Sequence, residues 1–126
     1  GPGALPSPTQ DPYRDTIVDL MTRSLDLWSD LTGKGKIEFA ETSGIWRVNL
    51  DKTSLQTRTL DKYLLADTLP TNPRWRDVVK TVNFIQTISE NEPLTEDLTA
   101  RLAQLSNQLE LFREMGVQRG LPDFSS

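Results

Sequence analysis

Apolar residues recur every three or four positions in the first part of this 126-residue chain. The stripe begins after Asp11-Pro12, a strong helix start, because the carboxylate can cap free backbone N–H groups and proline suits the first helical turn. Gly33 follows the last apolar position and favours a helix end. The pattern therefore predicts an amphipathic helix over residues 12–31.

The same period returns twice in the second half of the chain. Asn72-Pro73 repeats the start with a capping residue and proline, and predicts a helix over residues 73–89. Thr95 predicts the cap of a last helix that stops at Gly116. This helix carries a leucine stripe at steps of four and three, made of Leu98, Leu102, Leu105, Leu109 and Phe112.

The segment that follows the first helix has two interpretations. Residues 45–51 alternate between apolar and polar side chains, which is typical of a strand, and residues 36–40 would be the partner strand of a β-hairpin. Alternatively, residues 37–42 form a short helix that ends at Gly44, and residues 39–45 then resemble the second helix and turn of a helix-turn-helix. We favour the hairpin, because Ile-Trp-Arg-Val-Asn-Leu is poor turn material.

One more helix is predicted over residues 55–66, entered through Thr53, Ser54 or Thr57. The expected fold class is mainly α (α+β). It is a four-helix domain with a small β-hairpin inserted after the first helix, in the order α-β-β-α-α-α.

Composition along the chain predicts three regions. Residues 1–10 are expected to be a tag scar followed by a flexible, Pro-rich linker. Residues 11–118 are long enough for a single globular domain. Residues 119–126 are expected to be a flexible tail.

The absent residue types narrow the chemistry. The chain contains neither cysteine nor histidine, so it has no disulfide, no thiolate zinc site, no thiol nucleophile and no imidazole base. Its acidic clusters lack the spacing of a calcium-binding loop. We therefore expect no catalytic residues, no enzyme activity, no cofactor and no metal. No apolar run approaches the ~18 residues of a membrane span, so we expect no membrane partner and a cytoplasmic location.

Charge changes sign along the chain. Between residues 34 and 80, nine Lys and Arg residues stand against six Asp and Glu residues, which gives this basic block a net charge of +3. The whole chain carries −4. Such asymmetry indicates that one face meets a negatively charged partner while the rest repels it.

Within the basic block, arginines gather near predicted helix starts. A helix N-terminus exposes unpaired N–H groups that attract phosphate, and arginine adds bidentate contacts to phosphate or to guanine. The sequence therefore predicts a non-catalytic nucleic-acid-binding module, a DNA-binding domain of a regulatory protein. The residues expected to contact DNA are Arg47, Thr57, Arg58, Thr59, Lys62, Arg74 and Arg76.

The same features have purely structural interpretations. The threonines would then cap helices, Arg74 and Arg76 would pair with Asp67 or Asp77, and Trp75 would lie in the core. The leucine stripe would pack within its own domain. The alternative function is protein–protein interaction or homodimerisation, in which the leucine stripe holds a protein partner or a second copy of the chain.

Overall fold

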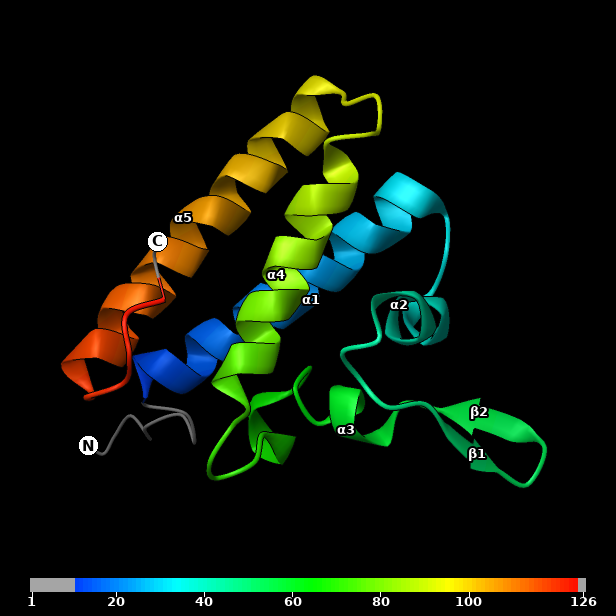
Figure 1. Cartoon of the computed structure of the whole chain (residues 1–126), viewed down its shortest axis with the longest axis horizontal. Helices are drawn as coiled ribbons and strands as arrows, with labels where there is room; N and C mark the ends of the chain where they lie inside the picture. The colour runs from blue at the N-terminus through cyan, green and yellow to red at the C-terminus, as the bar shows by residue number, and fades with distance from the viewer. Residues whose placement is uncertain (1–10, 125–126) are drawn as a thin grey trace, which may run out of the picture.

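Three long helices form the body of the domain. The computed structural model describes residues 11–124, so the predicted tag scar and linker and the last two residues of the predicted tail lie outside the described residues. The three helices are α1 (Pro12–Thr32), α4 (Trp75–Ser89) and α5 (Glu96–Gln118). Helix α1 packs against both α4 and α5, and α4 and α5 also contact each other (Figure 1).

Smaller elements connect α1 to α4 and lie at one side of the three helices (Figure 1). In chain order they are α2 (Lys36–Ser43), β1 (Asn49–Asp51), β2 (Ser54–Gln56), α3 (Arg58–Asp61) and the 3-10 turn η1 (Ala66–Thr68). The two strands pair antiparallel, and Figure 1 shows this hairpin projecting from the rest of the molecule.

The predicted fold class is confirmed, because the described chain is mainly helical with one small two-stranded hairpin. The position predicted for the hairpin is wrong. Residues 36–43 are helical, and the strands lie later, at 49–51 and 54–56. The described residues therefore contain five α-helices and not four.

Local contacts explain why residues 36–43 form α2. The Gly35 N–H donates to the Glu38 carboxylate at 3.2 Å, which satisfies a free donor at the helix start. The Gly35 carbonyl accepts from the Trp28 indole at 2.9 Å, so this start is held against α1. Gly44, at φ +68°, ends α2 as the alternative interpretation predicted. An extended segment and the hairpin follow Gly44, so among the described residues no helix comes directly after this turn, as a helix-turn-helix would require.

The first and last helices of the chain, α1 and α5, begin at their predicted cap residues. The Asp11 carboxylate accepts from the Tyr13 N–H at 3.0 Å and starts α1, and Gly33, at φ +74°, ends it. The Thr95 hydroxyl accepts from the Leu98 N–H at 3.1 Å and starts α5. The predicted stop at Gly116 is wrong, because α5 continues to Gln118.

Two other predicted helices have different bounds. The helix predicted over residues 55–66 is reduced to the single turn of α3, because β2 takes up residues 54–56. Helix α4 begins at Trp75, with Arg74 and not Asn72 at its cap position.

Residues 119–124, predicted from the sequence to be a flexible tail, contact the helices. The Phe124 ring lies 6.0 Å from Trp75 and 6.3 Å from Phe112, measured between ring centroids. The Arg119 guanidinium pairs with the Asp11 carboxylate at 3.1 Å. Residues 119–124 therefore contact the start of α1, the start of α4 and the C-terminal half of α5.

Candidate nucleic-acid interface

Every cation outside the basic block has a partner within the domain. Arg14 donates to two backbone carbonyls, and the other four pair with carboxylates. The pairs are Arg14 with Leu69 and Pro70, Arg23 with Asp19, Arg101 with Asp30 and Asp97, Arg113 with Glu110 and Asp123, and Arg119 with Asp11. Four of these five charges are therefore neutralised by carboxylates, and the fifth, Arg14, is held by backbone carbonyls.

Most cations inside the basic block have no such partner within residues 11–124. Lys36 pairs with Asp61 at 2.5 Å, and Arg58 pairs with Asp51 at 2.7 Å. The other seven, which we call the free cations, are Lys34, Arg47, Lys52, Lys62, Arg74, Arg76 and Lys80. All seven are exposed, and none forms an ion pair with another residue of the described range 11–124. The exposed cations without a protein partner in the described chain thus all belong to one block of the sequence.

A buried cluster of three side chains holds the segments that carry these cations. The Trp46 and Tyr63 rings lie 4.8 Å apart between centroids, and the Trp46 indole N–H donates to the Thr81 hydroxyl at 2.8 Å. All three side chains are buried. We call them the Trp46 cluster. It joins the segment before β1, the segment after α3 and the middle of α4.

Four free cations lie next to this cluster. Arg47 follows Trp46 along the chain, Lys62 precedes Tyr63, and Lys80 precedes Thr81. The backbone N–H of Arg74 donates to the Tyr63 phenolic oxygen at 2.7 Å. Segments far apart in the sequence are therefore brought together, with a cation at the surface beside each buried anchor.

Helix α3 connects α2 to the hairpin through side-chain bonds. Its Asp61 carboxylate accepts from the Thr57 hydroxyl at 3.0 Å and pairs with Lys36. Its Arg58 guanidinium reaches Asp51 at the end of β1. The Arg58–Asp51 pair is exposed on both sides, so it contributes little to stability, and phosphate can compete for Arg58.

The structure separates the seven residues expected to contact DNA by their exposure. Five arginine and lysine residues are exposed: Arg47, Arg58, Lys62, Arg74 and Arg76. Thr59 is half-buried, and Thr57 is only 1% exposed, with its hydroxyl turned to Asp61. Neither threonine makes a side-chain cap bond to α3, and a four-residue helix has little dipole to attract phosphate.

The structural interpretation of the arginines near α4 is not realised. Neither Arg74 nor Arg76 pairs with Asp67, Asp77 or any other carboxylate of the described chain. Trp75 is half-buried at the edge of the core, and the Arg76 guanidinium lies over its ring at 4.4 Å from the centroid. Both arginines are thus available to an external partner.

The leucine stripe is used mainly inside the domain. Leu105 and Phe112 are fully buried, while Leu98, Leu102 and Leu109 are partly buried against the same core. This packing accounts for the contact of α5 with α1 and α4. Self-association through the stripe remains a prediction.

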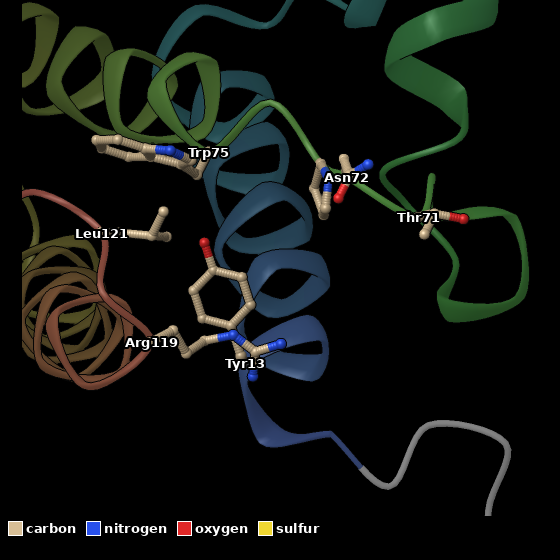
Figure 2. A pocket seen from close by; sticks show the side chains of 7 residues that line it. Tyr13, Thr71, Asn72, Trp75, Arg119 and Leu121 are labelled. Atoms are coloured by element: carbon tan, nitrogen blue, oxygen red, sulfur yellow. The ribbon is translucent and has the colours of Figure 1, made fainter.

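A depression of about 300 Å³ lies beside the start of α4. Figure 2 shows Tyr13 of α1 at its centre, with Arg119 and Leu121 from the end of the chain and Thr71 and Asn72 from the loop before α4. The Arg119 guanidinium lies 4.5 Å from the centroid of the Tyr13 ring. Burial raises the pKa of the Tyr13 phenol, and the nearby Arg119 charge offsets part of that rise.

Two negative findings concern the described chain. Within residues 11–124, no helix combines the length and the apolar character that a membrane span requires. Nor do three or more carboxylates of this range gather into a group that could hold a metal ion.

Lys52 is a free cation that the sequence did not single out as a contact. It lies at the turn of the hairpin, at φ +57°. Its position at the turn depends on which residues form the two strands, and the predicted strands lay earlier in the chain. The only local signal was the polar run Asp51–Ser54, which is typical of a turn.

A solved structure is similar to this chain in both sequence and fold. It is the crystal structure of the DNA-binding domain from the sensor histidine kinase ChiS from Vibrio cholerae. The two chains are 40% identical with a TM-score of 0.64, and the match covers 80% of this chain and 95% of that chain. No protein-family model and no curated protein matches this chain. At this identity and coverage, the chain belongs to the same family as the DNA-binding domain of the sensor histidine kinase ChiS.

Proposed function

We propose that this domain binds DNA as the non-catalytic module of a regulatory protein. The observation that carries the proposal is that cations inside and outside the basic block differ in whether they have a partner within the domain. Every cation outside the basic block is bound within the domain, four by carboxylates and Arg14 by backbone carbonyls, whereas seven of the nine inside it are exposed and unpaired within residues 11–124. An exposed, unneutralised cation is the group that phosphate binds, because binding releases the counterions condensed on DNA.

The net charge of the whole chain supports an oriented contact. A protein of net charge −4 is repelled by DNA at long range unless its basic face leads. The acidic remainder therefore keeps non-specific contact through other faces weak. The family relationship agrees with this reading, because the solved relative is itself a DNA-binding domain.

Most of the contacts we propose come from residues beside the Trp46 cluster. Arg47, Lys62 and Arg74 extend from backbone that this cluster fixes, and Arg76 lies at the start of α4. Arg58 joins them by exchanging Asp51 for a phosphate, at a cost of roughly 0–1 kcal/mol for an exposed pair. Thr57 and Thr59 shape the backbone around α3 and make no direct contact to the duplex.

Fluorescence anisotropy with a mixed-sequence duplex tests the proposal. The first variant is Arg74→Ala/Arg76→Ala, which removes two free cations. The control is Arg23→Ala/Arg101→Ala, which makes the same change in net charge but removes two cations already paired with carboxylates. Each protein is measured at about 50 and about 200 mM salt.

We expect the wild type to bind and to lose affinity steeply with salt. The first variant should bind more weakly, and the slope of log affinity against log salt should fall by about two, one for each phosphate that the variant no longer binds. The control should keep the wild-type slope. The proposal is wrong if the wild type does not bind at low salt, or if both variants weaken binding equally.

A further inference from the structure

The outer face of the hairpin carries two exposed leucines. Leu50 and Leu55 are directly opposite each other in the strand register, so their side chains lie on the same face. Their exposed fractions are 73% and 44%. The neighbouring pair Asn49 and Gln56 is half-buried on the other face, toward the domain. The hairpin therefore presents an apolar face away from the molecule.

A lysine occupies a strained position at the tip of this hairpin. The turn between Asp51 and Ser54 has two central residues, and the first, Lys52, has φ +57°. Glycine is the usual residue at such a position, because a Cβ atom crowds the backbone there. Lysine costs stability at this point, and a strained residue at an exposed tip is typical of a functional contact.

The charge around the leucine pair is positive. The single acid of the hairpin, Asp51, is paired with Arg58, while Lys52 and Arg47 are free cations. A protein partner that covered only Leu50 and Leu55 would bury far less than the ~800 Å² per side of a standard interface. A small apolar surface on a hairpin whose free charge is positive matches a DNA groove better than a second protein.

We propose that the hairpin inserts into the minor groove of bound DNA, with Leu50 and Leu55 as an apolar wedge and Lys52 on the phosphate backbone. This inference rests on the proposed DNA binding. The outer face has no polar side chain beside the leucines to read base edges in the major groove. Leucine is among the residues that wedge against base steps in the minor groove.

Insertion at this place requires the DNA to bend. Two paired strands lie ~4.8 Å apart before side chains are added, and the minor groove is only ~6 Å wide. The hairpin enters only if the groove widens, which kinks the duplex toward the major groove. Pyrimidine–purine steps such as TA open most easily, so such a step should be preferred under the wedge.

The test uses a duplex with a donor and an acceptor dye at its two ends and 2-aminopurine at a central TA step. Energy transfer reports bending, and 2-aminopurine fluorescence reports unstacking. The test variant is Leu50→Ala/Leu55→Ala. The control is Leu94→Ala/Leu111→Ala, which removes two leucines with exposed fractions of 42% and 39% from elsewhere on the surface. Circular dichroism checks that both remain folded.

We expect the wild type and the control to bend the duplex and to raise 2-aminopurine fluorescence. Leu50→Ala/Leu55→Ala should lose both signals and bind roughly tenfold more weakly, because less apolar surface is buried against the bases. Its salt slope should remain that of the wild type, because every cation that binds phosphate is still present.

Lys52→Gly supplies a second, independent signature. Glycine relieves the strain at φ +57°, so the melting temperature should rise, while loss of the tip cation should lower DNA affinity several-fold. If the turn makes no contact with DNA, the melting temperature should rise and DNA affinity should not change. That result would overturn the role of Lys52.

The remaining outcomes separate this inference from the proposed function. If the wild type binds DNA without bending it, and Leu50→Ala/Leu55→Ala binds like the control, the wedge is wrong and DNA binding stands. If the wild type does not bind DNA at low salt, both fail. Conversion of a dimer to a monomer by Leu50→Ala/Leu55→Ala, seen by light scattering, would then assign the leucine pair to a second copy of the chain.

Discussion

The backbone N–H of Arg74 donates a 2.7 Å hydrogen bond to the phenolic oxygen of Tyr63, eleven residues earlier in the chain. The Tyr63 ring is buried against Trp46, so the bond ties the cap position of α4 to the core. A free cation at the surface is thus held by a side chain that is itself fixed from inside.

Tyr63→Phe should therefore affect both stability and DNA binding. The variant keeps the ring contact with Trp46 but removes the acceptor for the Arg74 N–H. We expect a loss of about 1–2 kcal/mol in the free energy of unfolding, measured by urea denaturation. DNA affinity should fall a few-fold, because the start of α4 loosens. Tyr13→Phe is the control, since the Tyr13 hydroxyl forms no hydrogen bond with residues 11–124. Equal DNA affinities for the two variants would contradict the link between Tyr63 and Arg74.

Thr81→Val should destabilise the domain more than expected for an exchange between two side chains of nearly equal size. The Thr81 hydroxyl accepts from the buried Trp46 indole N–H at 2.8 Å, and valine would leave that donor without a partner. The expected loss is about 1–3 kcal/mol. Thr87→Val is the matched control, because Thr87 makes the same hydroxyl-to-backbone bond on α4 as Thr81 but is exposed. Chemical denaturation of the two variants gives the comparison, and a Thr81→Val loss no greater than that of the control would contradict a structural role for this bond.

The parts of the fold predicted from sequence are those with local determinants. Asp11 and Gly33 cap α1, and Thr95 caps α5, through bonds to residues within four positions. A short-range signal is visible in the sequence itself, so these ends were predicted correctly. The start of α4 was predicted two residues early because its position depends on Tyr63, a tertiary contact that no local pattern reveals.

The hairpin shows how a periodic pattern can mislead. Residues 45–51 do alternate in sequence, and Trp46 is buried while Arg47 is exposed, but Leu50 of the same apolar set is 73% exposed. Only residues 49–51 find a strand partner, however, because Gly35 and Glu38 start a helix in the segment expected to pair with them. Alternation therefore identified neither the strand partner nor the side of the hairpin that faces the core.

The basic block was recognisable from sequence, whereas the pairing of its charges was not. Counting residues shows nine cations but cannot show that only Lys36 and Arg58 are neutralised. The Trp46 cluster, which gathers Arg47, Lys62, Arg74 and Lys80 around one anchor, depends on contacts between residues up to 35 positions apart.

Asp51→Asn should increase DNA affinity. The substitution removes the carboxylate that holds Arg58 and so adds one free cation to the proposed interface. We expect tighter binding and a salt slope larger by about one. Stability should change by less than ~1 kcal/mol, because the pair is exposed. Asp26→Asn makes the same change in net charge at an exposed position of α1. Equal gains for both variants would mean that only the overall charge matters.

The free energy of unfolding should fall at alkaline pH in a way that depends on the burial of Tyr13. Burial raises the pKa of its phenol, so the folded state holds that proton more tightly than the unfolded state does. The resulting stabilisation is fully present below the unfolded pKa of about 10 and is lost as pH rises through the higher folded value.

Tyr63→Phe leaves Tyr13 as the single tyrosine, so its ultraviolet absorbance titration is read directly and should have its midpoint above that of the same chain in denaturant. The difference in unfolding free energy between this variant and Tyr13→Phe/Tyr63→Phe should be constant below about pH 9 and shrink above about pH 10. Because both proteins carry the same lysines, ionisation of those side chains cancels in the difference. A normal midpoint in the folded protein, with no change in that difference, would show that the Tyr13 hydroxyl reaches water freely.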